Sequence, residues 1–311
     1  IDISRFSDME VVELAREREI DIAIDLGGLT AGARLNLFSL RVAPIQISYL
    51  GYLGTLGSSY MDYIIADKII IPKHLQSEYT ENIFYLPHYQ CNDSKKEISS
   101  KKFTRADLDL PEKGFVYCCF NQTIKITPSI FSSWMNILKA VEGSVLWLYA
   151  TNEIDHKNLL KEAIKHKISQ ERIIFGQKMP RTEYLARFRV ADLFLDTAPY
   201  NAGTTASDAL WAGLPVLTFT GKSFAARVCS SVLTSAGFPE FITNSQEAYE
   251  IMAIKLGKDK DKIKFIKKKI EEEIRYSSLY NIEKFTRSLE SGYKKAYQMT
   301  QKNKVLENII C

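Results

Sequence analysis

The feature that most constrains the fold is a regular alternation of strand-like and helix-like segments between residues 115 and 219. Short apolar runs expected as strands cover 115–120, 145–149, 172–175, 193–195 and 216–219, and segments expected as helices lie between them at 128–141, 158–167, 181–190 and 205–212. Strands that alternate with helices of this length form a parallel sheet with helices on both faces. We therefore expect an α/β fold with a doubly wound parallel sheet.

A polar, lysine-rich stretch divides the chain. Residues 91–109 show little apolar periodicity, and further strands are expected before them at 21–26, 45–50 and 63–66. We predict an N-terminal lobe with its linker over 1–104, a second lobe over 105–281 and a C-terminal helix over 282–311. A chain of 311 residues is long enough for two domains with their own cores.

Composition argues against several classes of protein. The net charge of +4 is small and spread along the chain, so we expect no nucleic-acid partner. No apolar run approaches the roughly 20 residues of a membrane span, and we see no secretory leader. The five cysteines show neither a paired framework nor metal-ligand spacing, so we expect no metal and a cytoplasmic location. Because the sequence begins at Ile1 rather than Met, and within a pattern that is already under way, we interpret it as a piece of a longer protein.

Two unusual loops follow the first and fourth expected strands of the sheet. Residues 121–128 read NQTIKITP, and residues 196–205 read DTAPYNAGTT. In the usual doubly wound order the first strand lies beside the fourth, and ligands bind outside the carboxyl ends of the strands at this switch point. The sequence therefore predicts that the two loops meet in one crevice.

The first loop carries features that suit an anion. Thr127 is a good N-cap and Pro128 suits the first helical position, so a helix is expected to start there. Lys125 lies two residues before the cap, where its ammonium adds to the partial positive charge of the helix end. The alternative interpretation, that Thr127 and Pro128 only start a helix, is equally plausible for these two residues taken alone.

The second loop adds small and polar residues at another helix start. Gly203 allows backbone to approach a ligand closely, while Thr204 and Thr205 offer hydroxyls and amides. Asp208 lies one turn later than Thr204, where a carboxylate can accept hydrogen bonds from ribose hydroxyls. Together the loops predict a site for a nucleotide diphosphate compound, although Asp208 alone could merely balance a helix dipole.

The same residues resemble a known family. The runs DLGGLTAGARLNLFSLRVAPIQISYLGYLGTLGSSYMDYIIAD, FNQTIKITPSIFSSWMNILKAV, DTAPYNAGTTASDALWAGLPV and SFAARVCSSVL are similar to the catalytic region of O-linked N-acetylglucosamine transferases, including SPINDLY-like and bacterial members. The resemblance covers essentially the whole chain. It implies a GT-B architecture of two Rossmann-like lobes, and inverting, metal-independent transfer of a sugar, N-acetylglucosamine, from a UDP-sugar to Ser or Thr of a protein. It implies no cofactor beyond the UDP-sugar substrate.

The resemblance also implies roles for single residues. Gln122 and Lys125 match positions that contact the diphosphate, and Thr204 and Thr205 match the phosphate-binding pair. Asp208 matches the ribose-binding carboxylate, while Arg181 and Tyr184 match positions near the uracil base. Gly203 stands near the donor, where many relatives have a histidine. Lys125 is thus the residue expected to stabilise the leaving group. We identify no general base. We expect a structural role for His88 in YLPHYQ and a core-edge or surface position for Arg227.

Departures from the family pattern keep other functions open. Gly203 puts the sugar preference in doubt, and Leu53 replaces a proline usual in an acceptor-side loop. Relatives have further strands, and a histidine near the acceptor, before the segment that matches Ile1, so we expect an incomplete first lobe. The alternatives are a fragment that binds a nucleotide sugar without catalysis, or a transferase for another nucleotide sugar or an asparagine acceptor.

Overall fold

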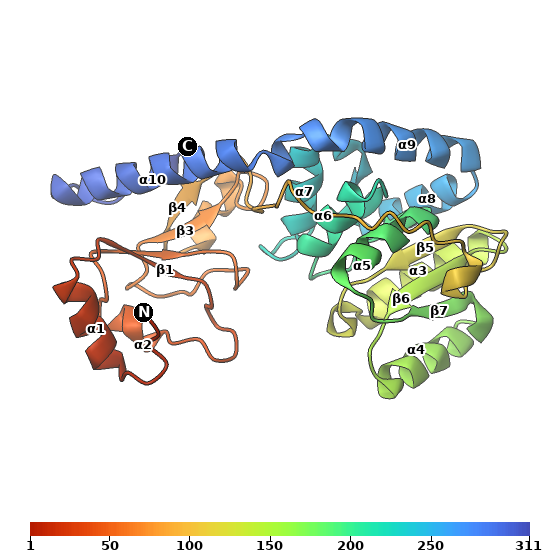
Figure 1. Ribbon diagram of the computed structural model, residues 1–311, viewed down its shortest axis with the longest axis horizontal. Coiled ribbons are helices and arrows are strands. Elements are labelled where there is room, and N and C mark those ends of the chain that lie inside the picture. The colour runs from red at the N-terminus through yellow and green to blue at the C-terminus, as the bar shows by residue number, and fades with distance from the viewer. The chain divides into compact units, whose positions relative to one another are not determined.

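The computed structural model describes residues 1–311 as two compact units (Figure 1). The first unit combines Ile1–Cys91 with Ile282–Cys311, and the second is Asn92–Asn281. Two boundaries differ from the expected ones. Residues 92–104 belong to the second unit because they pack on it, for example through the Ser99 amide, which donates to the Thr182 carbonyl at 3.1 Å. Residues 282–311 complete the first unit.

The second unit is built on a six-stranded parallel sheet. Its strand order is β10-β9-β8-β5-β6-β7, and the strands are β5 Val116–Cys119, β6 Val145–Tyr149, β7 Ile173–Gly176, β8 Leu193–Leu195, β9 Val216–Phe219 and β10 Ile242–Thr243. The expected adjacency of the first and fourth strands is confirmed, with Tyr117 opposite Leu193 and Cys118 opposite Phe194. The doubly wound sheet predicted from the alternation is therefore present.

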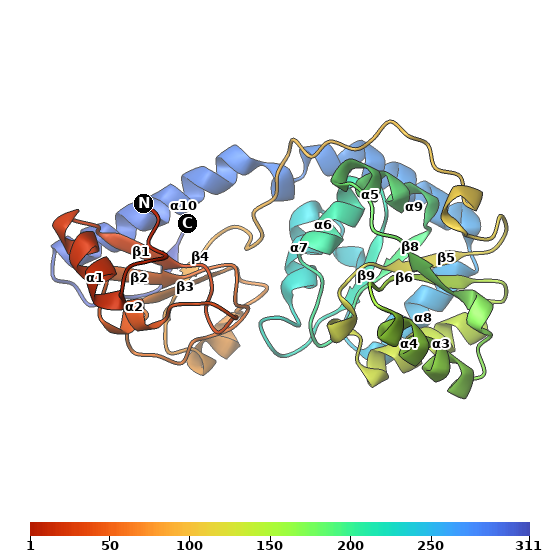
Figure 2. The ribbon, with the colours of Figure 1, turned by 60° about the horizontal axis from the view of Figure 1, so that its bottom comes forward.

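Helices cover both faces of this sheet (Figure 2). On one side lie α3 Pro128–Ala140, α4 Glu153–Lys165 and α8 Gln246–Gly257, and on the other α5 Arg181–Arg187, α6 Thr204–Trp211 and α7 Val228–Ala236; α9 Lys260–Glu273 packs against α8. Helix α4 begins earlier than expected because the Asn152 side chain accepts the Asp155 amide at 2.8 Å and caps the helix.

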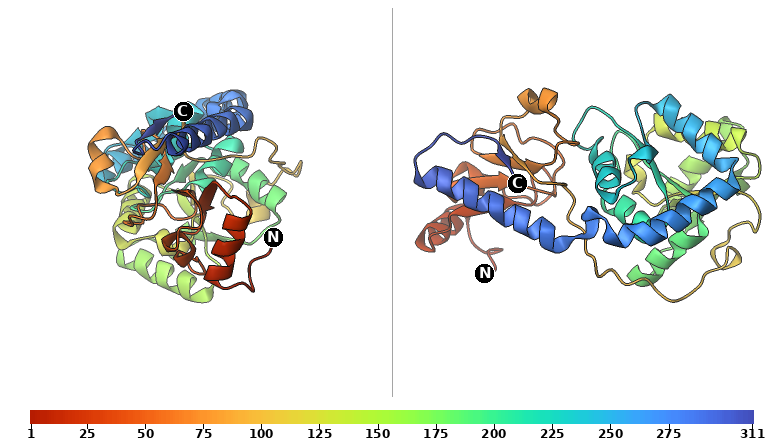
Figure 3. Two further views of the ribbon diagram at one scale, coloured as in Figure 1. Left: turned by 90° about the vertical axis from the view of Figure 1, so that its left-hand side faces the viewer. Right: turned by 90° about the horizontal axis from the view of Figure 1, so that it is seen from above.

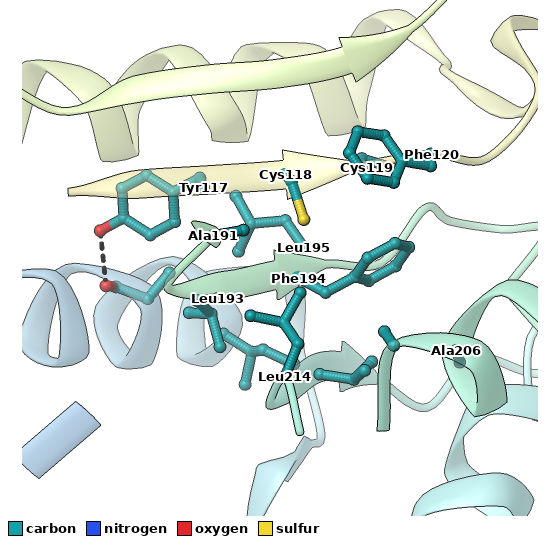
Figure 4. Close-up of a cluster of buried hydrophobic side chains, with 14 of the residues drawn as sticks. Tyr117, Cys118, Cys119, Phe120, Ala191, Leu193, Phe194, Leu195, Ala206 and Leu214 are labelled. Atoms are coloured by element: carbon teal, nitrogen blue, oxygen red, sulfur yellow. Dashed lines mark hydrogen bonds between the residues drawn. The ribbon is translucent and has the colours of Figure 1, made fainter. Parts of the chain in front are cut away.

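Aromatic and aliphatic side chains from adjacent strands form the core of this unit. Figure 4 shows β5 and β8 side by side, with Cys118, Leu193 and Phe194 among the buried residues between the layers. The Tyr117 hydroxyl donates to the Ala253 carbonyl of α8 at 2.8 Å and so satisfies the one polar group that this ring brings into the core. This packed sheet is the rigid base from which the two predicted loops project.

The first unit has a smaller parallel sheet of order β1-β2-β3-β4-β11. Its strands are β1 Ile22–Asp25, β2 Ile45–Ser48, β3 Tyr63–Ala66, β4 Asn82–Tyr85 and β11 Ile309–Ile310, and its helices are α1 Asp8–Glu17, α2 Asn36–Ser39 and α10 Ile282–Gln301. Helix α1 starts with a capping box, in which the Glu10 amide donates to Ser7 Oγ and the Ser7 amide to Glu10.

The last segment of the chain is integral to the first unit. Figure 3 shows α10 lying along this sheet with the C-terminus beside it. Helix and sheet approach closely at Gly292, where an added Cβ would lie 2.0 Å from the Phe84 ring. After the helix the chain turns back and β11 pairs in parallel with β4, with Ile309 opposite Phe84. No helix of the structure is both long and apolar enough to cross a membrane.

Candidate functional site

The two predicted loops meet at the carboxyl ends of β5 and β8 and are joined by hydrogen bonds. Asn121 Nδ2 donates to Thr197 Oγ1 at 2.7 Å, Lys125 Nζ donates to the Asn201 carbonyl at 3.1 Å, and Thr127 Oγ1 donates to the Ala198 carbonyl at 3.1 Å. Each bond runs from the first loop to the second. The crevice expected from strand order is thus one connected structure.

Asp196 organises the second loop from beneath. The carboxylate is 1% exposed; its Oδ1 accepts the amides of Thr197 and Ala202, each at 2.7 Å, and its Oδ2 accepts the Thr218 hydroxyl at 2.7 Å. These bonds draw residues 196–202 into a closed turn. The polar residues that end this strand therefore fix the loop that carries Gly203 and Thr204.

Burial raises the pKa of the Asp196 carboxyl. Desolvation raises the pKa of its carboxyl to about 6, although the hydrogen bonds from Thr218, Ala202 and Thr197 act in the opposite direction. The native state therefore binds this proton more tightly than the unfolded state, in which the pKa lies near 3.8.

We predict a matching pH dependence of stability. Because the folded pKa is raised, the contribution of Asp196 to the free energy of unfolding is greatest below about pH 4 and is lost as pH rises to about 6, by on the order of 2–3 kcal/mol. The stability difference between wild type and Asp196→Asn should shift by that amount between pH 4 and 7. All three tryptophans, Trp134, Trp147 and Trp211, lie in the second unit, so urea unfolding followed by tryptophan fluorescence reports this unit. A stability difference that stays constant between pH 4 and 7 would contradict the raised pKa of Asp196.

Lys125 is held between the two loops. Besides the Asn201 carbonyl, its ammonium lies 3.9 Å from the centre of the Tyr200 ring, in cation–π geometry. Burial lowers the pKa of Lys125, and the nearby Asp196 charge opposes that shift. Sequence reasoning did not identify Tyr200, whose side chain is partly exposed and covers the ammonium. The result is a partly desolvated positive charge at the switch point.

Both loops lead into helix starts. The Thr127 side chain accepts the Ile130 amide at 3.3 Å with Pro128 as the first residue of α3, as expected. Helix α6 begins at Thr204 after Gly203, a cap residue that has no side chain to bond its first amides. Thr204 is exposed and Thr205 half-buried. The start of α6 therefore combines backbone amides, two hydroxyls and the positive end of a helix, which suits a phosphate.

Asp208 lies one turn into α6 and is almost fully buried between two cations. Arg181 donates to it in a two-pronged arrangement, Nη1 to Oδ2 and Nη2 to Oδ1, each at 2.7 Å. Lys96 Nζ donates to Oδ1 at 3.0 Å. The structure thus brings together Arg181 and Asp208, which the resemblance placed at the base and the ribose. It adds Lys96, which lay in the predicted linker.

Aromatic rings and a buried arginine surround Tyr184. The Tyr184 ring packs against Phe120 and Phe188 at centroid distances of 6.2 and 5.2 Å, and burial raises the pKa of its hydroxyl. The Arg187 guanidinium lies 4.5 Å from the Tyr184 ring and is fully buried, with Nε and Nη2 lacking any hydrogen-bond acceptor. Arg187 and Trp147 both line a cavity of about 70 Å³, and the Trp147 Nε1 also lacks a hydrogen-bond acceptor. The spacing of Arg187 from Tyr184, three residues along one helix face, could have identified it.

Other predicted residues take varied positions. Gln122 is exposed at the start of the first loop. Arg227 precedes α7, and its Nη1 donates to the Gly221 carbonyl at 3.0 Å. His88 belongs to the first unit, where it is buried, its Nδ1 lies 3.0 Å from the Gln90 carbonyl and its ring lies 5.1 Å from Phe285. These contacts favour the structural role expected for His88. The structure groups no three His, Cys, Asp or Glu side chains as a possible metal site.

Two units, each built on a parallel sheet with helices packed against it, give this chain the GT-B architecture found in glycosyltransferases. Solved structures agree on this fold. Over 97% of this chain and 57% of the other, the structure matches a lysine-to-methionine variant of the O-GlcNAc transferase from Thermobaculum terrenum, with a TM-score of 0.89 and 30% identity. Alr3699/HepE from Anabaena, solved with UDP, matches 91% of this chain and 82% of its own with a TM-score of 0.61 and 15% identity, which indicates a shared fold.

The chain belongs to glycosyl transferase family 41, whose model matches residues 1–101 and 91–289. It is 34% identical, over 99% of its length, to the Arabidopsis thaliana protein named "Probable UDP-N-acetylglucosamine--peptide N-acetylglucosaminyltransferase SEC". It is 26% identical, over 87% of its length, to the UDP-N-acetylglucosamine–peptide N-acetylglucosaminyltransferase of Caenorhabditis elegans. The chain covers 33% of each of these relatives.

Proposed function

We propose that this chain binds a UDP-sugar in its second unit and transfers the sugar, N-acetylglucosamine, to serine or threonine of a protein acceptor, with inversion and without a metal. The observation that carries the proposal is the convergence of Lys125, the start of α6 and the Arg181–Asp208 pair at one switch point. The names of the relatives, UDP-N-acetylglucosamine–peptide N-acetylglucosaminyltransferases, support both the donor and the peptide acceptor. We also propose a cytoplasmic location, no cofactor and no nucleic-acid partner.

Each part of UDP has a matching group in this proposal. The diphosphate takes the amides and hydroxyls at Thr204 and Thr205, with Lys125 and the exposed Gln122 beside it. The ribose hydroxyls bond to Asp208. The uracil lies near Arg181 and Tyr184, and Arg187 supplies unpaired N–H groups that can donate to its carbonyls.

The chemistry follows from the charge that develops on the leaving group. The acceptor oxygen forms a bond to the anomeric carbon while the bond from that carbon to the diphosphate breaks, and the acceptor proton passes to a base. UDP leaves with added negative charge, which Lys125 and the helix amides stabilise from fixed positions in a partly dry crevice. A cation already desolvated by Tyr200 suits this task because its interaction with the oxyanion is screened less.

Calorimetric titration with UDP and GDP, with EDTA and with magnesium, tests the proposal. We expect UDP to bind with the same affinity in both buffers and more tightly than GDP. Asp208→Asn should weaken UDP binding by about tenfold or more, because hydrogen bonds to a charged carboxylate contribute about 1.5–3 kcal/mol. Binding that requires magnesium would contradict the metal-free site. Tight UDP binding with no transfer to any acceptor would instead favour the non-catalytic alternative.

A further inference from the structure

The nucleoside side of the site contains a lysine from outside both loops. Lys96 belongs to residues 92–104, which pack on the second unit, and its Nζ donates to Asp208 Oδ1 at 3.0 Å and to Ser207 Oγ at 3.2 Å. Only 9% of the Lys96 side chain and 2% of the Asp208 side chain are exposed. A buried ion pair of this kind is stable only when its hydrogen bonds are complete, and removing one partner leaves a costly buried charge.

Packing and hydrogen bonds fix Lys96 at both ends. Trp211 Nε1 donates to the Lys96 carbonyl at 2.9 Å, which ties the backbone of this segment to α6. At the other end, the ammonium lies 5.4 Å from the centre of the Tyr280 ring, and the Tyr280 hydroxyl donates to the Ser207 carbonyl. Lys96 therefore cannot withdraw from Asp208 without losing its hydrogen bond to Ser207 and its contact with the Tyr280 ring.

Arg181 contrasts with Lys96 in its freedom to move. Its side chain is 54% exposed, although it donates to both oxygens of Asp208. A carboxylate offers about four acceptor positions, and Arg181 and Lys96 together fill three of them. A ribose diol needs two, so one of the present donors must give way when a nucleotide binds. The exposed Arg181 is the donor that can leave at low cost.

We propose that Lys96 is a positioning residue for nucleotide recognition: it holds the Asp208 carboxylate in place while Arg181 yields an acceptor position to the ribose hydroxyls. The inference rests on the proposed function, because it takes Asp208 as the ribose acceptor. Without Lys96, Arg181 is the one cation left beside Asp208, so it stays bonded to both carboxylate oxygens. The carboxylate then accepts fewer hydrogen bonds from the diol, while the diphosphate contacts at Lys125 and α6 stay as they are.

The test compares the affinities of two ligands, with and without the ribose hydroxyls, across wild type and matched variants. UDP and 2′,3′-dideoxy-UDP are titrated by calorimetry into wild type, Lys96→Met, Lys96→Arg and the control Lys95→Met, an exposed neighbour in the same segment. We expect wild type and Lys95→Met to prefer UDP by about 10- to 100-fold. Lys96→Met should weaken UDP binding by about tenfold or more, change dideoxy-UDP binding less than about threefold, and so remove most of the preference; Lys96→Arg should restore part of it.

The outcomes separate this inference from the proposed function. If Lys96→Met weakens both ligands equally, or leaves the preference intact, Lys96 has only a structural role and the inference is wrong. Should Lys96→Met fail to fold, as judged by circular dichroism, Lys96→Gln takes its place, because it keeps a hydrogen-bond donor without the charge. Asp208→Asn decides the other question. If that variant retains the full preference for UDP, or wild type does not bind UDP, the proposed site itself is wrong and the inference falls with it.

Discussion

Lys125→Ala should lower the rate of sugar transfer by about 10²–10³-fold, which corresponds to about 3–4 kcal/mol of lost transition-state stabilisation. The reason is the position of the ammonium, which lies at the meeting of the two loops between the Tyr200 ring and the Asn201 carbonyl. Charge on the departing diphosphate grows during the reaction, so the loss should fall mainly on kcat. UDP affinity should fall too, by about tenfold, because a charge-assisted hydrogen bond is removed.

The measurement is UDP release from UDP-N-acetylglucosamine in the presence of a pooled serine and threonine peptide substrate, alongside calorimetry with UDP. Lys139→Ala is the matched control, since Lys139 is exposed near the end of α3, the helix that follows Lys125. We expect Lys139→Ala to behave as wild type. An unchanged UDP affinity in Lys125→Ala would exclude Lys125 from the phosphate site.

Gly257→Ala should destabilise the second unit by about 2–4 kcal/mol. Gly257 ends α8 beside β5, and an added Cβ would lie 2.0 Å from the Tyr117 hydroxyl oxygen and 3.0 Å from Val141 Cγ2. The methyl group must displace the ring or the helix, and overpacking of this kind costs about 1–3 kcal/mol. Displacement also breaks the hydrogen bond from Tyr117 to the Ala253 carbonyl, drawn in Figure 4, at a further cost of about 1 kcal/mol.

A double-mutant cycle isolates this contact. Tyr117→Phe removes the oxygen that the new methyl group meets, so the two substitutions together should cost at least about 1 kcal/mol less than the sum of the single changes. Urea unfolding followed by tryptophan fluorescence gives the change in the free energy of unfolding of the second unit for each single variant and for the double variant, relative to wild type. Strict additivity, or a Gly257→Ala protein as stable as wild type, would show that α8 shifts freely and that the close approach is unimportant.

The sheet of the second unit could be predicted from the sequence because its strands are short apolar runs bounded by polar turns. Its helix starts are equally visible, as at Thr127 and Pro128. Strand β11 could not be predicted, because Ile309 and Ile310 form a strand only by pairing with β4, which lies far away in the sequence. Helix α2 was missed as well; it has only four residues and its first turn lacks a side-chain cap.

The site residues, like the strands and helices, could be predicted where the local sequence pattern marks them, but not where they depend on contacts between distant segments. Residues on the two loops were accessible to sequence reasoning, because strand order alone brings the ends of β5 and β8 together. Lys96 was not, because nothing in a polar lysine-rich segment distinguishes the lysine that packs under Tyr280 and reaches Asp208 from its exposed neighbour Lys95. Tyr200 and Arg187 owe their importance to ring and cation contacts made across elements, which periodicity does not show.

The return of the chain to its first unit has a consequence for how the protein is made. Helix α10 and strand β11 are translated after the whole second unit, yet they cover and extend the sheet that contains β1. The second unit is continuous from Asn92 to Asn281, so it can fold before α10 and β11 are made. The first unit must wait with the β4 edge and the Phe84 surface uncovered until residues 282–311 are made. During that interval the β4 edge is open to pairing with a strand of another chain.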